Sequence, residues 1–155
     1  MKEQFIKLFE YDKTANIKVA EALAEIDNPP ENCTRLLFHI GNAMDLWYRR
    51  VTHQEAVSKD LFANAPVEES KKMLIQSSDN WINFIKELPE EKLSNEILYM
   101  TIRGEQFEST IEDIIWQLLT HAPYHRGQIN TYLRRNNLDT VSQDYIYYRR
   151  KNNTL

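Results

Sequence analysis

Apolar residues recur along this chain with the period of about 3.6 residues that is typical of amphipathic helices. Prolines and asparagines interrupt the pattern where helices are expected to end, as at residues 28–30. Because each apolar stripe can be buried only against another element, the pattern predicts an all-α four-helix bundle. The predicted helices are residues 2–26, a segment from a cap at Asn32 or Thr34 to about residue 53, residues 67–88, and a segment from a cap at Ser109 to about residue 135.

The segments between these helices follow other patterns. Residues 54–66 lack a sustained period and are predicted to be a connection. In residues 90–108, apolar and hydroxyl side chains surround a glycine-containing turn at 103–105, which predicts a short hairpin or structured loop before the last helix. Ser109 and Glu112 have the spacing of a capping box, so we expect the last helix to begin there.

The composition is that of one ordinary soluble domain across residues 1–155. The chain is 42% hydrophobic and 27% charged, and a chain of this length buries enough surface to fold without disulfides or a metal. Its 3 glycines and 5 prolines are too few for a turn-rich all-β protein. A metal bound to such a chain is therefore expected to have a functional role.

Charge and cysteine content bear on partners and location. With 19 Lys and Arg against 23 Asp and Glu, the net charge is -4, so we expect no nucleic-acid partner. Charged residues interrupt every apolar segment, and the amino end lacks the pattern of a signal peptide, so we expect no membrane partner. Cys33 is the single cysteine and can form no internal disulfide. These features together predict a cytoplasmic protein.

Histidines supply the candidate chemistry. His121 and His125 are four residues apart on the last predicted helix, so both project from one face. His39 lies at the edge of the second apolar stripe, which allows three imidazoles to converge from two helices. Three histidines suit a first-row divalent cation and leave a coordination position for water or substrate. His53 lies about 21 Å further along a continuous helix and cannot join them.

Each candidate group also has a simpler interpretation. A single histidine on an apolar face can be a structural residue with satisfied hydrogen bonds. Asp12 and Asn16 lie on the inward stripe of the first helix, where polar groups need partners. In one interpretation they hold a ligand imidazole or a bound water beside the metal. In the other they line a water-filled notch or the exposed rim of the bundle.

Residues 121–129, His-Ala-Pro-Tyr-His-Arg-Gly-Gln-Ile, resemble the signature of the DinB/YfiT-like superfamily. Leu-Phe-His-Ile at 37–40 and Tyr-Asp-Lys-Thr-Ala-Asn at 11–16 resemble its motifs on the second and first helices, although Asp12 stands where the family's motif has asparagine. The resemblance implies an up-down-down-up bundle that is frequently a homodimer. It also implies a bound divalent metal, for which zinc and nickel are the first candidates and manganese and iron the next. The metal ligands that it implies are His39, His121 and His125.

The resemblance does not select one reaction, because relatives include thiol-dependent S-transferases, an isomerase with a thiol cofactor and members without an assigned activity. The leading hypothesis is a metal-dependent enzyme that activates water or a low-molecular-weight thiol for attack on a small electrophile, as an S-transferase or hydrolase. No side chain is assigned as the nucleophile, and Cys33 is expected to be a small buried hydrophobe. The alternative is a non-catalytic, stress-associated dimeric module with a structural or adventitious metal, whose contact surface includes Trp116.

Overall fold

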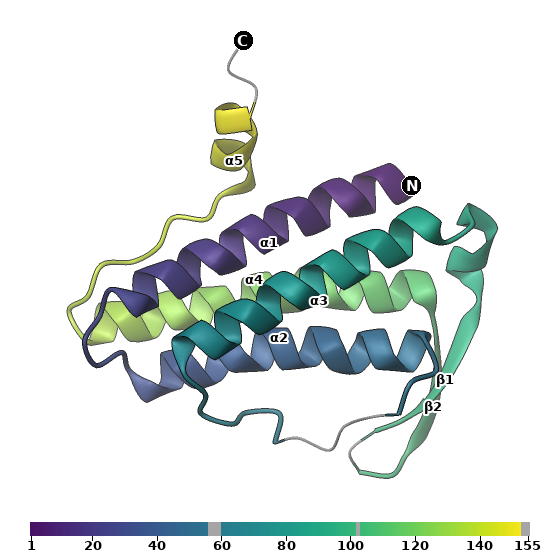
Figure 1. The fold of residues 1–155 in the computed structure, drawn as a ribbon, viewed down its shortest axis with the longest axis horizontal. Coiled ribbons are helices and arrows are strands. Elements are labelled where there is room, and N and C mark those ends of the chain that lie inside the picture. The colour runs from purple at the N-terminus through teal and green to yellow at the C-terminus, as the bar shows by residue number, and fades with distance from the viewer. Residues whose placement is uncertain (56–59, 102, 153–155) are drawn as a thin grey trace.

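Four long helices lie side by side and form the body of the protein (Figure 1). α1 and α4 run in one direction and α2 and α3 in the opposite one, which confirms the expected up-down-down-up bundle. α1 and α2 each pack against both α3 and α4. The structure is a computed structural model that describes residues 1–55, 60–101 and 103–152. The bundle helices are α1 (Lys2–Ala24), α2 (Glu31–Val51), α3 (Val67–Glu87) and α4 (Ile111–Arg135).

Apolar side chains from all four helices fill the centre of the bundle. Trp81 of α3 is fully buried, its indole N–H donates to the Met44 carbonyl at 3.0 Å, and Phe9 stacks on its ring. Burial of one large apolar side chain contributes about 1.5–3 kcal/mol. Among the described residues, none of the helices combines the length and apolar character that crossing a bilayer requires. The predicted inward positions of α1 and α4 that are buried include Phe5, Phe9, Val19, Leu23, Ile111, Ile114, Ile115, Leu118, Ala122, Ile129 and Leu133.

The connection between α2 and α3 brings a further segment to the histidines. α2 ends near the β-hairpin, whereas α3 begins at the opposite end of the bundle, so the chain returns past α2 (Figure 1). His53 starts this return in a left-handed conformation, with a φ of 55°, and is exposed. The return brings Leu61 and Phe62 into contact with α2 side chains. Residues 56–59 of the predicted connection lie outside the described residues.

The start of α4 differs from its prediction by one residue. Thr110 is the cap, and its Oγ1 accepts a hydrogen bond from the Asp113 N–H at 3.0 Å. Ser109 belongs to the preceding strand, and its hydroxyl lies 3.2 Å from that of Tyr99. The predicted cap at Ser109 is wrong by one residue: β2 continues through Thr110, the helix begins at Ile111, and the last strand residue is the one whose hydroxyl reaches the first turn.

The start of α2 also differs from its prediction. The residue before the helix is Pro30, with a φ of -54°, and the first helical residue is Glu31. Thr34 lies inside the first turn, where its hydroxyl donates to the Glu31 carbonyl at 2.9 Å. The predicted caps at Asn32 and Thr34 are wrong because the helix already begins at Glu31, so both residues lie inside its first turn.

The predicted hairpin is present at one end of the bundle. η1 (Glu90–Ser94) leads into β1 (Glu96–Met100), which pairs antiparallel with β2 (Gln106–Thr110). Gly104 in the turn has a φ of 80°, which a residue without Cβ adopts at little cost. Residue 102 of the predicted hairpin lies outside the described residues.

The chain after α4 returns to α1 before it leaves the bundle. Lys18 of α1 donates to the Ser142 carbonyl at 2.7 Å, and the Tyr11 hydroxyl donates to the Gln143 carbonyl. Beyond residue 143, α5 (Tyr145–Asn152) points away from the long axis of the bundle in Figure 1, but it stays in contact with α1 because the rings of Tyr145 and Tyr148 lie 5.1 and 5.6 Å from that of Tyr11. Residues 136–144, which we call the strap, therefore tie α1 to the C-terminal segment of the chain.

Candidate metal centre

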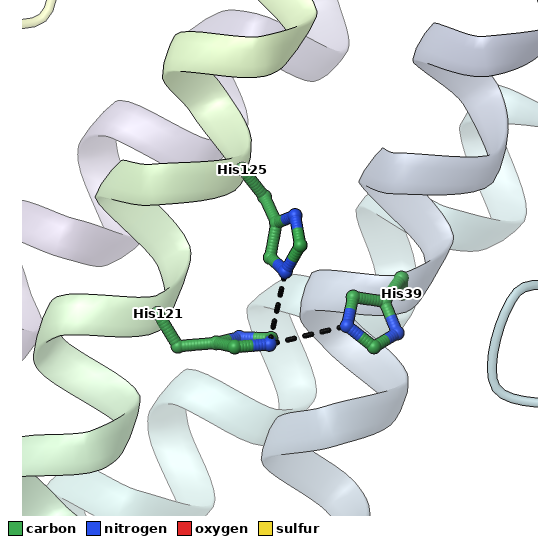
Figure 2. A group of neighbouring side chains, drawn as sticks. All are labelled: His39, His121 and His125. Atoms are coloured by element: carbon green, nitrogen blue, oxygen red, sulfur yellow. Dashed lines mark hydrogen bonds between the residues drawn. The ribbon is translucent and has the colours of Figure 1, made fainter.

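Three imidazoles meet between α2 and α4 (Figure 2). The Nε2 atom of His121 lies 3.1 Å from Nε2 of His39 and 3.0 Å from Nε2 of His125. One ligand atom from each side chain can be chosen so that all three lie within 4.8 Å of one another. The structure thus brings together the three side chains that the sequence singled out.

Helix geometry explains this convergence. His121 and His125 are one turn apart on α4 and flank the buried Ala122, so both face the neighbouring helix. His39 lies on α2 next to the buried Ile40, and α2 packs directly against α4. The apolar stripes that hold the two helices together therefore also set the separation of the imidazoles.

The outer nitrogens of two imidazoles are held by oxygen acceptors. Nδ1 of His39 lies 3.0 Å from the Leu61 carbonyl, and Nδ1 of His125 lies 2.7 Å from Oε1 of Gln128. A carbonyl oxygen can only accept, so Nδ1 carries the proton in the neutral form of His39, and the amide oxygen of Gln128 assigns the same tautomer to His125. Their Nε2 atoms then present lone pairs to the centre of the cluster, as metal-binding histidines do.

This arrangement of nitrogens fits a divalent cation. His121 Nε2 faces two acceptor nitrogens and can carry at most one proton, so at least one of the two contacts brings lone pairs together. A cation held by all three would replace that repulsion with attraction. Nitrogens bound to zinc at about 2.0–2.1 Å in tetrahedral geometry lie about 3.3 Å apart, close to the two short separations here.

Burial keeps the imidazoles in the form that binds metals. Burial first, and then electrostatic repulsion from the neighbouring His125 and His39, together lower the pKa of His121 to about 4. Burial is also the main cause that lowers the pKa of His39 and that of His125. All three are therefore neutral near pH 7, and a neutral imidazole is the form that binds a metal ion.

Aromatic side chains shield the cluster. The Phe62 ring stacks on the His39 ring with centroids 3.9 Å apart, and Tyr124 lies edge-on to His125 with centroids 5.1 Å apart. Both aromatic residues are nonetheless exposed on their outer sides. The cluster thus lies just below the surface, where a small molecule can approach it.

Asp12 and Asn16 contact a residue that sequence reasoning missed. Both are buried, and Arg126 Nη1 donates to Asp12 Oδ1 at 2.5 Å and to Asn16 Oδ1 at 2.7 Å. Arg126 Nε donates to Oε1 of Gln143 at 2.7 Å. Burial raises the pKa of the Asp12 carboxyl, and the Arg126 guanidinium opposes that rise. The described contacts of Asp12 and Asn16 therefore lead to the residue after His125 and not to an imidazole.

Cys33 and Trp116 have the environments that were predicted. Cys33 is completely buried near the carbonyl of Ile129, and burial raises the pKa of its thiol to about 11, so it is not a nucleophile at neutral pH. Trp116 is 46% exposed and contacts the Phe5 ring edge-on. Neither residue belongs to the histidine cluster.

Three groups around the cluster were not predicted, and they differ in how visible they are in the sequence. Gln128 follows His125 by three residues on a helix, a spacing that places the two side chains in contact. Arg126 gave a weaker signal, as the cation that the buried Asp12 needs. The Leu61 carbonyl gave no signal, because a backbone acceptor from a return segment depends on the path of the chain.

Comparison with known proteins identifies relatives of the whole bundle. The model of the DinB family matches residues 1–152. The crystal structure of a DinB-like protein from Bacillus cereus is similar, with a TM-score of 0.66 and 15% sequence identity over 90% of this chain and 95% of that chain. At this identity the likeness concerns the fold. No curated protein matches this chain.

Proposed function

The chain belongs to the DinB family, and from that premise we propose that His39, His121 and His125 bind one divalent metal ion. The observation that carries the proposal is the convergence of three Nε2 atoms while Nδ1 of two imidazoles is hydrogen-bonded to an oxygen acceptor. The candidate ions are zinc and nickel first, then manganese and iron, because imidazole nitrogen suits all of these metals.

The proposed function extends to catalysis on a small molecule. A bound divalent ion acts as a Lewis acid that favours the deprotonated form of water or a low-molecular-weight thiol, which makes a nucleophile available near neutral pH. The three histidines supply neutral donors, and Gln128 and the Leu61 carbonyl fix the orientation of two of the rings. Phe62 restricts access of bulk water to His39. We propose S-transfer or hydrolysis on a small electrophile, with water or the thiol rather than a side chain as the nucleophile.

The first experiment measures metal content by mass spectrometry on tag-free protein, with wild type beside His39→Ala. Circular dichroism confirms that both proteins are folded. We expect close to one equivalent of metal in the wild type and a loss of most of it in the variant. Absence of metal after reconstitution with zinc, nickel and manganese would refute the proposal.

Trp116 favours a second function, in which the protein is a dimeric binding module whose metal has a structural role. Its half-exposed indole on α4 offers a contact surface, and large aromatics are enriched in such interfaces. We propose a cytoplasmic homodimer that uses this surface and binds no nucleic acid. Light scattering on wild type and Trp116→Ser measures the mass of each in solution and tests the contact. We expect a dimer for the wild type and a monomer for the variant, and an equal mass for the two proteins would refute the contact. A salt-sensitive band shift with duplex DNA would refute the exclusion of nucleic acid.

A further inference from the structure

A pocket of about 320 Å³ adjoins the histidine cluster in the groove between α2 and α4. It reaches the cluster at His125, which lines it, and its wall at Phe62 is the ring that stacks on His39. Apart from these residues, its walls include two tyrosines, Tyr124 and Tyr132. A small molecule that reaches the cluster from this side must therefore pass through or occupy the pocket.

Arg35 gives this pocket its charge. Among the lining residues that the structure describes, Arg35 carries a full charge and the others are aliphatic, aromatic, amide or imidazole groups. It lies four residues before His39 on α2, so the two side chains project from the same face about 6 Å apart along the axis. The pocket thus places a cation one helical turn from the candidate metal ligands.

The guanidinium of Arg35 is held in place with most of its donors available. Its Nε donates to the Phe62 carbonyl at 2.8 Å, which uses one of the five N–H groups. Its ion pair with Glu31 is long, at 3.9 Å from Nη1, and the Glu31 side chain is 66% exposed, so this contact is weak. The outer edge of a guanidinium matches the two oxygens of a carboxylate.

We propose that Arg35 binds the carboxylate of a small organic acid whose other end reacts at the histidine cluster, with the aromatic walls packed against its carbon skeleton. The inference rests on the proposed metal site and names the class of molecule that it takes. The acid is one of the two reactants of the proposed reaction, either the thiol or the electrophile. In both cases Arg35 would recognise its carboxylate.

The test uses the cobalt-loaded protein, because thiolate binding to cobalt produces a charge-transfer absorption that reports on the metal directly. The probes are 3-mercaptopropionate, which has a carboxylate, and 2-mercaptoethanol, which is a neutral thiol of similar size. We expect the acid to bind about tenfold more tightly in the wild type, since hydrogen bonds to charged groups are strong. The preference should fall to about one in Arg35→Gln and be partly retained in Arg35→Lys.

Arg103→Gln is the matched control, because it removes the same charge from an exposed position in the hairpin turn. It should keep the preference of the wild type. Benzoate, measured by calorimetry on the same cobalt-loaded proteins, identifies the source. Binding of benzoate that depends on Arg35, without a preference between the two thiols, would assign the carboxylate to the electrophile.

The outcomes separate this inference from the proposal that it rests on. If wild type binds no cobalt, the metal site is wrong and this inference falls with it. If cobalt binds equally to wild type and Arg35→Gln but neither the thiol preference nor benzoate binding changes, the metal site stands and the role of Arg35 is overturned.

Discussion

His125 and Arg126 are neighbours on α4 and lie in two different polar clusters. His125 faces α2 and meets His121 and His39, whereas Arg126 faces α1 and meets Asp12 and Asn16. Both clusters are buried or nearly so. They differ in whether the protein satisfies them by itself. The guanidinium has a carboxylate and two amide oxygens as partners, whereas at least one of the two contacts between histidine nitrogens brings lone pairs together.

This difference indicates which cluster supports the fold and which one is available for binding. The Arg126 cluster ties α1, α4 and the strap after α4 together through complementary donors and acceptors. In the histidine cluster, a bound cation would replace repulsion between nitrogen lone pairs with attraction. Adjacent positions on one helix therefore serve two purposes, because a step of one residue turns a side chain by about 100°.

The largest expected effect comes from breaking the Arg126 cluster. Asp12→Ala should destabilise the protein by about 3–5 kcal/mol, because it leaves a buried guanidinium without its counter-ion. Urea denaturation measures the change. Asp79→Ala is the control, since Asp79 pairs with Lys13 at the surface and its loss should cost less than about 1 kcal/mol. Equal costs for the two variants would show that the buried pair does not support the fold.

Removal of a histidine should change metal binding much more than it changes the stability of the metal-free protein. His121→Ala should leave the metal-free protein folded, with a stability change of about 1 kcal/mol or less, but abolish stabilisation by zinc. In the wild type, zinc at a hundred times its dissociation constant should add about 2.7 kcal/mol to the free energy of unfolding. His53→Ala, at an exposed helix end, should respond to zinc as the wild type does. Unfolding of the metal-free His121→Ala protein would contradict the distinction between the clusters.

A smaller effect should follow from loss of the acceptor that orients His125. Gln128→Leu removes the oxygen bonded to Nδ1, and loss of such partners lowers metal affinity by about 10–100-fold. Competition with a chelator measures the affinity. Gln117→Leu changes an exposed glutamine on the same helix and should leave the affinity unchanged. An affinity equal to that of the wild type in Gln128→Leu would show that this hydrogen bond does not position the ring.

A further test concerns the pH dependence of stability in the metal-free protein. An imidazole in the unfolded chain has a pKa near 6.5, whereas that of His121 in the fold is about 4. Between these values the unfolded chain binds more protons, so the free energy of unfolding should fall as the pH is lowered from about 6.5 towards 4. Urea denaturation at several pH values measures the slope. His121→Gln should flatten it, and an unchanged slope would contradict burial of a neutral imidazole.

The fold could be predicted because its evidence is local and repeated. The apolar period of α1 and α4 identified the faces that are buried, and residues such as Phe9 and Ile129 lie where the pattern places them. The ends of helices were less predictable, because neighbouring residues can serve as caps. Ser109 and Thr110 both carry a hydroxyl, and the length of β2, which runs through Thr110, decided which of them caps the helix.

The sequence by itself determined that His39, His121 and His125 lie on helix faces turned inward, because helical spacing and apolar stripes are properties of short segments. Only the tertiary structure decided their partners. It brought the Leu61 carbonyl to His39 through a chain that returns past α2, and it gave Asp12 to Arg126 rather than to an imidazole. The physical reason is that a partner far along the chain is selected by how whole helices pack, and packing sums many weak contacts that no single motif records.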